Sequence, residues 1–223
     1  AGGTYHGTVT NNTNGKIDEG TFLDTVTNNG QIIYDGSWNL LRTVAMVPDE
    51  VRALVDYCDE RSLPLWLVSE QRSRFNYHFN DRVPVVMAEI HTEIPERCDL
   101  HTMLQEPVVK AVMFLTAQEV REGPLSFMPH ARSTQWFIHG QDIIPAEGGK
   151  LPAMRFMAEA NGWTRDELMA FGDSENDNEM LRYAGTGVAM GNALEETKAA
   201  SDYVTDDCDD EGVAHALAHF ALI

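Results

Sequence analysis

The hydrophobic positions in the last third of the chain recur in short blocks that predict alternating helices and strands. Helices are expected at 151–161, 178–183, 195–200 and 212–220, and strands at 167–170, 187–190 and 202–205. Pro152 in the first turn of a helix and Gly162 after its last turn are typical of helix ends. This β-α order with short loops predicts a parallel sheet covered by helices.

The middle of the chain has a more mixed pattern. Pro48-Asp49-Glu50 is typical of a helix start, because acids favour the positive end of the helix dipole, and one apolar face follows. Strands are expected at 65–68, 75–79, 108–115 and 134–138, and a short helix at 117–121. Residues 81–106 give no clear signal. Together these elements predict a compact α+β unit.

The first 20 residues carry no hydrophobic period. Two strands are expected next, at 21–27 and 31–34, joined by the turn Asn28-Asn29-Gly30 and followed by a second turn into 39–47, which predicts a hairpin. Because α/β domains usually begin with a core strand and none is visible here, we expect the first strand to be missing or to lie outside this sequence.

The charge and the cysteine content of the chain limit the classes of function that it could have. The chain has 223 residues and a formal net charge of -19 at pH 7, which argues against non-specific nucleic-acid binding, since that needs a Lys/Arg surface. No apolar run approaches the ~18 residues of a membrane span, and no signal-peptide pattern is present. The three cysteines have no metal-ligand spacing. We therefore expect reduced thiols and a cytoplasmic protein.

The candidate chemistry centres on the stretch from Phe171 to Asp177. It predicts a tight turn between a strand and a helix that carries two carboxylates, Asp173 and Asp177, and the amide of Asn176. In open α/β sheets ligands bind at the carboxyl ends of the strands. Paired carboxylates there suit a hard cation such as Mg²⁺.

Lys150 lies upstream of this turn and begins a predicted helix. The helix dipole disfavours a cation at that end, so the lysine is a candidate functional residue. Taken alone, it could equally be a solvated surface lysine.

Taken together, these segments resemble a known family. Gly172-Asp173-x-x-Asn176-Asp177-x-x-Met180-Leu181, then 187–193 and 198–205, with Lys150 upstream, resemble the haloacid dehalogenase-like superfamily, in particular its Cof-type sugar-phosphate phosphatases. The resemblance is dense from 150 to 223. In the first half it is weaker, and Thr27 to Gln31 resembles the Asn-Gly turn of the family.

The resemblance implies a Rossmann-like α/β core, at 1–40 and 138–223, with an inserted α+β cap domain at 41–137. It also implies Mg²⁺-dependent hydrolysis of phosphate esters of small metabolites, foremost sugar phosphates, through an aspartyl-phosphate, by a monomer or small homo-oligomer without nucleic-acid or membrane partners.

Four residues match functional positions of the family. Asp173 matches the Mg²⁺ ligand, and Asp177 matches a second acid close to the metal or to the lysine. Asn176 matches an amide that contacts phosphate or substrate, and Lys150 matches the lysine that neutralises phosphate charge. A carboxylate nucleophile attacking a phosphate dianion needs such cations to offset repulsion.

One family motif is not found. The Asp-x-Asp-Gly-Thr strand that carries the nucleophile is absent from this sequence. The acids at Asp206 to Asp210 and at Asp35-Gly36 do not stand where the family's order of motifs requires this strand. The second motif could be Ala1 to Thr4, with Gly2 in place of a phosphate-binding hydroxyl.

Three explanations of that absence stay open. They are an N-terminal part of ~40 residues not included here, a deliberate fragment, and a natural pseudo-enzyme that only binds a phosphate ligand. We expect this exact polypeptide not to hydrolyse phosphate esters. A phosphomutase with the same machinery is a further alternative.

Other polar and aromatic residues favour structural roles. His215 and His219 are spaced for a metal pair but have no third ligand nearby in sequence, and 206–211 lacks the pattern of a calcium loop. Arg72 and Arg74 could reach an anion, although exposed loop arginines are commoner. The aromatic residues of the middle region could line a sugar site, but core packing is the default: Trp66, Phe75, Tyr77, Trp136 and Phe137.

Overall fold

The computed structural model describes residues 8–10 and 24–223. The chain forms two compact units, residues 1–149 and 150–223. The second motif expected at Ala1 to Thr4 and the start of the strand expected at 21–27 lie outside the described residues.

The first unit contains a four-stranded sheet with the order β1-β2-β3-β4. Its strands are β1 (Thr8–Thr10), β2 (Asp24–Thr27), β3 (Ile32–Asp35) and β4 (Leu40–Thr43). β1 and β2 are parallel, whereas β2, β3 and β4 pair antiparallel, which confirms the predicted hairpin. The turn between β2 and β3 has positive φ at Asn28, Asn29 and Gly30, a conformation that asparagine and glycine tolerate best.

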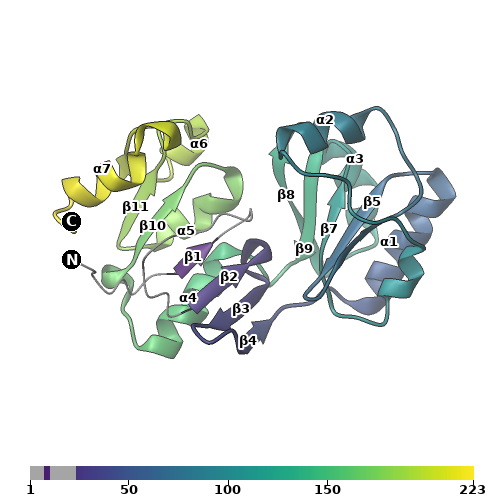
Figure 1. The fold of residues 1–223 in the computed structure, drawn as a ribbon, viewed down its shortest axis with the longest axis horizontal. Coiled ribbons are helices and arrows are strands. Elements are labelled where there is room, and N and C mark those ends of the chain that lie inside the picture. Colours follow the sequence, from purple (N-terminus) through teal and green to yellow (C-terminus); the bar gives the residue numbers. More distant parts are fainter. Residues whose placement is uncertain (1–7, 11–23) are drawn as a thin grey trace. The chain divides into compact units, whose positions relative to one another are not determined.

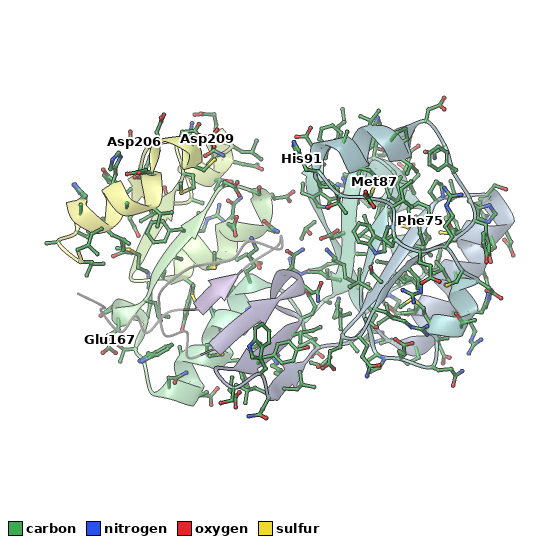
Figure 2. The ribbon with its side chains drawn as sticks, in the orientation of Figure 1. Phe75, Met87, His91, Glu167, Asp206 and Asp209 are labelled. Carbon is green, nitrogen blue, oxygen red and sulfur yellow. The ribbon has the colours of Figure 1, made fainter. Side chains whose placement is uncertain are left out.

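A second sheet in this unit has five antiparallel strands in the order β6-β5-β7-β9-β8 (Figure 1). The strands are β5 (Leu65–Ser69), β6 (Ser73–Phe75), β7 (Val108–Met113), β8 (Ala131–Phe137) and β9 (Gly140–Pro145). Helices α1 (Pro48–Arg61) and α3 (Ala117–Glu122) pack on one face around Leu54 and Met113, and α2 (Arg82–Glu89) packs on the other. The buried residues on the α2 side, called the α2 cluster, are Phe75, Val83, Val86, Met87, Val112 and Phe114. Figure 2 labels Phe75 and Met87 of this cluster. The α+β unit expected from the sequence is therefore confirmed.

One predicted strand in this region differs from the structure, and two elements were not predicted. The strand expected at 75–79 ends at Phe75, because Asn76 turns inward, accepts the Leu65 N–H at 3.1 Å and donates to the Leu63 carbonyl at 2.9 Å. The hydrophobic pattern does not reveal strand β9, because the strand begins with Gly140-Gln141-Asp142. Every residue of β9 is nevertheless buried. Helix α2 falls in the stretch that gave no clear pattern.

The two connections between these sheets meet at Gln31, which follows the hairpin turn. The Gln31 carbonyl accepts the N–H of Val44 at 2.8 Å, on the connection into α1. The Gln31 side chain lies against Gly148, on the connection that leaves β9, where an added Cβ would come within 3.0 Å of Nε2. Entry to and exit from the five-stranded sheet are thus close together.

The second unit is a three-stranded parallel sheet with the order β10-β11-β12. Its strands are β10 (Met169–Gly172), β11 (Thr186–Ala189) and β12 (Tyr203–Val204), and its helices are α4 (Lys150–Asn161), α5 (Asn178–Tyr183), α6 (Glu195–Lys198) and α7 (Gly212–His219). The predicted parallel β-α pattern is confirmed. β10 starts at Met169 because Glu167 (Figure 2) accepts both the N–H and the hydroxyl of Thr164 at 2.8 Å and holds a short 3₁₀ turn there.

Short 3₁₀ turns lie between the longer elements. They are η1 (Asn28–Gly30), η2 (Leu100–Met103), η3 (Pro124–Ser126), η4 (Arg165–Glu167), η5 (Glu175–Asp177) and η6 (Cys208–Asp210). Cys58, Cys98 and Cys208 are free thiols, as expected. Within the described part of the chain, no helix has the length and apolar character that a bilayer span requires.

The ion pair between α2 and α3 predicts an acid-dependent stability. The Glu119 carboxylate accepts from Arg82 at 2.7 Å and from the Thr116 N–H at 2.7 Å, and Arg82 is the main cause that lowers its pKa to about 2. A lowered pKa stabilises the fold above the unfolded-state value of about 4.5, and this contribution is lost as the pH falls towards 2. Glu119→Gln should therefore reduce the free energy of unfolding at pH 7 more than at pH 3, as measured by urea denaturation.

Glu122→Gln is the matched control on the same helix, where Glu122 accepts from the neutral Gln118 side chain. It should change stability by no more than about 0.5 kcal/mol. A pH-independent loss in Glu119→Gln would contradict the ion-pair explanation.

Candidate functional site

The turn after β10 brings the predicted acidic residues together. Residues 175–177 form η5, and α5 continues from Asn178. Asp173 and Asp177 therefore flank a single tight turn at the carboxyl end of a parallel strand. This is the location where ligands bind in open α/β sheets.

The Asp177 carboxylate is the centre of this turn. Oδ1 accepts from Lys150 Nζ at 2.6 Å, and Oδ2 accepts from the N–H groups of Asp173 and Ser174 at 3.2 and 3.3 Å. Asp177 is 2% exposed and the Lys150 side chain 11%. Because an unpaired charge is costly to bury, each of the two residues holds the other in place. This pairing explains why a lysine stands at the first position of α4, where the helix dipole disfavours a cation.

Because Gly172 has no side chain, the Asp177 side chain can pack directly against its backbone. A Cβ added at Gly172 would lie 2.4 Å from Asp177 Cβ and 2.7 Å from Asp177 Cγ. Gly172 belongs to the acidic motif, but the sequence alone indicates no role for it. The tight turn was its only signal, since the contact joins residues five apart through space.

Asp173 differs from Asp177 in its surroundings. It is exposed, and its Oδ1 accepts from the Ser174 hydroxyl at 3.1 Å. The loop after β11 holds its backbone, because the Met190 N–H donates to the Gly172 carbonyl at 2.9 Å and the Leu194 N–H donates to the Asp173 carbonyl at 3.2 Å. An exposed carboxylate on a fixed backbone suits Mg²⁺, which binds through one or two carboxylates and keeps several waters.

The four predicted site residues thus fall into two groups. Lys150 and Asp177 form a buried pair, whereas Asp173 is exposed and Asn176 half-buried in the same turn. Asp177 already receives three N–H donors. As a metal ligand it would have to share its oxygens with Lys150 and the backbone, so Asp173 is the better fit to a cation.

The loop after β12 adds further acids to the same end of this sheet. One ligand atom each of Asp207, Cys208 and Asp209 lies within 4.8 Å of the others. The hydrogen bond to Asp207 is the main cause that raises the pKa of the Cys208 thiol, and the Asp173 charge contributes. Asp206 and Asp209 (Figure 2) and Cys208 are exposed, in agreement with the solvated loop expected at 206–211.

The histidines of α7 have separate partners. His215 Nδ1 lies 2.7 Å from Asp206 Oδ2, whereas the His219 ring stacks on Tyr203 at 4.3 Å. They do not converge on one metal position.

The arginines and aromatic residues of the five-stranded sheet also have structural partners. Arg72 pairs with Glu106, and Arg74 with Glu96. Phe75 is fully buried, and Trp66, Trp136 and Phe137 pack against the α2 cluster, whereas Tyr77 is exposed.

Known proteins are similar to this chain in sequence and fold. A family profile described as haloacid dehalogenase-like hydrolase matches residues 10–217. The chain is 29% identical over 173 residues to YkrA of Bacillus subtilis, provisionally named a phosphatase, and the match covers 78% of this chain and 66% of that protein. The chain therefore spans just under two thirds of the length of this curated relative.

Two further matches cover more of the chain. The chain is 26% identical over 204 residues to the 5-amino-6-(5-phospho-D-ribitylamino)uracil phosphatase YcsE of Bacillus subtilis, with 88% of this chain and 72% of that protein covered. A solved structure of a HAD subclass IIB sugar phosphatase matches with a TM-score of 0.81 and 28% identity, over 91% of this chain and 77% of that chain.

The buried pair predicts that removing only the lysine lowers the free energy of unfolding more than neutralising both partners. Lys150→Met leaves Asp177 buried without its cation and should lower the free energy of unfolding by about 3–5 kcal/mol. Adding Asp177→Asn should recover part of that loss. The measurement is denaturant unfolding of both variants, and an additive double variant would contradict the pairing.

Lys198→Met is the control, because Lys198 pairs with Glu195, whose side chain is 91% exposed. Surface pairs contribute little, so this variant should cost less than about 1 kcal/mol.

Gly172→Ala tests the close approach of Gly172 to Asp177. The new methyl group must displace the Asp177 side chain, so we expect a loss of about 1–3 kcal/mol from overpacking. Glu175→Ala, an exposed position in the same turn, should stay within about 0.5 kcal/mol. Equal melting temperatures for Gly172→Ala and the wild type would exclude the steric role.

Proposed function

The chain belongs to the haloacid dehalogenase-like hydrolases, and we propose that its protein is a Mg²⁺-dependent phosphoric monoester hydrolase acting on small phosphorylated metabolites, foremost sugar phosphates. The observation that carries the proposal is the Lys150–Asp177 pair beside the exposed carboxylate of Asp173. The pair supplies a fixed ammonium from α4 beside a turn that carries a candidate metal ligand, in a chain with a net charge of -19.

Lys150 is the proposed phosphate-binding residue. Its ammonium has three N–H donors, one of which bonds to Asp177 at 2.6 Å. The others can bind phosphate oxygens. Because Asp177 fixes the ammonium before the substrate arrives, the charge needs no reorganisation when negative charge develops on the phosphoryl group.

Asp173 is the proposed Mg²⁺ ligand, with Asn176 as a phosphate or substrate contact from the same turn. Asp177 is the second acid of the motif, and its three donors support a role in holding Lys150 and the turn. A bound Mg²⁺ would neutralise phosphate charge and polarise a phosphoryl oxygen.

The remaining parts of the family's site are proposals too. Hydrolysis through an aspartyl-phosphate requires a carboxylate nucleophile, and we assign it to none of the described residues. The division into a core at 1–40 and 138–223 and a cap at 41–137 is likewise proposed. A cap of this kind would exclude water from the site when it closes.

The proposed substrate class rests on the matched proteins. One is named for a phosphoribitylamino compound and another is a sugar phosphatase. Both names describe a phosphate ester on a hydroxylated carbon chain, and the same class is proposed for this protein.

The full-length protein, screened against a panel of phosphorylated metabolites with and without Mg²⁺, tests the proposal. We expect phosphate release that needs Mg²⁺, and a loss of at least about 100-fold in kcat/KM in Asp173→Asn, because the metal would lose a charged ligand. Glu175→Gln, an exposed acid in the same turn, is the matched control and should retain activity.

Unchanged activity in Asp173→Asn would remove the metal-ligand assignment. Phosphate transfer between sugar positions without release would instead identify a mutase. Binding of phosphate esters without turnover would leave a binding protein.

A further inference from the structure

The connection between α2 and β7, residues 90–107, is attached to helix α1 through a histidine that lies between two carboxylates. His101 Nε2 lies 2.9 Å from Asp56 Oδ1 on α1, and His101 Nδ1 lies 2.9 Å from Asp99 Oδ1 in the connection itself. We call these three side chains the His101 bridge. The proposed catalytic chemistry uses none of them.

Both ring nitrogens of His101 face a carboxylate oxygen, and this geometry fits the protonated ring. A neutral imidazole has one N–H and one lone pair. Whichever nitrogen lost its proton would direct that lone pair at a carboxylate oxygen, which is also an acceptor. The imidazolium donates from both nitrogens and therefore satisfies Asp56 and Asp99 together.

The two carboxylates also favour the charged form of the ring energetically. The hydrogen bond to Asp56 is the main cause that raises the pKa of His101 above its ordinary value of 6.5, and the hydrogen bond to Asp99 adds to it. A raised pKa means that the bridge stabilises the fold fully below the unfolded-state value. This contribution is lost as the pH rises through the folded-state pKa.

Helix α1 carries further charged groups of both signs near the bridge. Arg52 lies one turn before Asp56, and Asp59 and Glu60 lie one turn after it. His78 Nε2 lies 3.1 Å from Asp59 Oδ1, so Asp59 has a histidine of its own. Asp56 is thus the carboxylate of α1 that faces His101.

The connection has other attachments, which limit how far it can move. Leu100 and Met103 are buried in the same core as Leu54 of α1. Near its end, Glu106 pairs with Arg72 from the turn before β6. The His101 bridge therefore holds the outer side of the turn η2, while the apolar side chains hold its inner side.

We propose that the His101 bridge is a pH-sensitive contact, in which the protonated ring attaches η2 to α1 and loss of the proton releases the outer side of η2. Histidine is the side chain whose ordinary charge change lies between pH 5 and 8. The connection between α2 and β7 would therefore open more readily at alkaline pH. This inference does not depend on the proposed function.

Hydrogen–deuterium exchange of the full-length protein, read by mass spectrometry, measures this release in peptides that cover 99–106. His101→Gln should exchange about threefold faster than the wild type at pH 5.5, because two charged contacts at the surface are lost. At pH 8.5 the ratio should fall below about 1.5. Comparing variant and wild type at each pH cancels the pH dependence of the chemical exchange step.

His91→Asn is the matched control in the same connection. The exposed His91 ring (Figure 2) contacts the Glu89 carbonyl at 3.1 Å, and asparagine tolerates the positive φ of this position. Its exchange in 99–106 should match the wild type at both pH values.

Titration of His101 by NMR tests the cause of the release. The midpoint should lie above 6.5 in the wild type and should fall in Asp56→Asn and in Asp99→Asn, because each variant removes one carboxylate that favours the charged ring. A wild-type midpoint at or below 6.5 would overturn the inference. An exchange ratio in His101→Gln that is the same at both pH values would do so as well.

Discussion

The ion pair between Lys150 and Asp177 is the constraint on which the second unit depends. It joins the first residue of α4 to the turn between β10 and α5, and each partner would be costly to bury alone. Gly172 makes room for the carboxylate, and two backbone N–H groups occupy its other oxygen. The exposed position of Asp173 follows from this arrangement, because the turn that points Asp177 inward carries Asp173 on its outer side.

The second unit was largely predictable from sequence, because its signals are local. Helices ending at glycine, capped turns and apolar runs each lie within a few residues, and the β-α order then fixes a parallel sheet. The candidate site residues were chosen from the acidic turn together with the family resemblance. Their division into a buried pair and an exposed acid did not, since it depends on which oxygen meets which donor in space.

The five-stranded sheet was harder to predict, because its decisive contacts are distant in sequence. Strand β9 is fully buried yet starts with glycine, glutamine and aspartate, so no apolar run marks it. The partner that satisfies Asp142 best, Asn29, lies 113 positions away. Asn76 ends β6 by bonding to the backbone of Leu63 and Leu65, which a pattern of alternating residues cannot show. A strand that contains buried polar residues cannot be recognised from a pattern of hydrophobic positions.

The meeting of both connections at Gln31 has an evolutionary consequence. A segment whose ends lie side by side can be inserted into a host domain, lengthened or exchanged without moving the host's own strands. The hydrogen bonds that pair β2 with β3 lie within the hairpin itself, outside the segment between Val44 and Gly148. The five-stranded sheet could therefore change in sequence under a selection of its own, provided that contacts such as the one between Asn29 and Asp142 are kept.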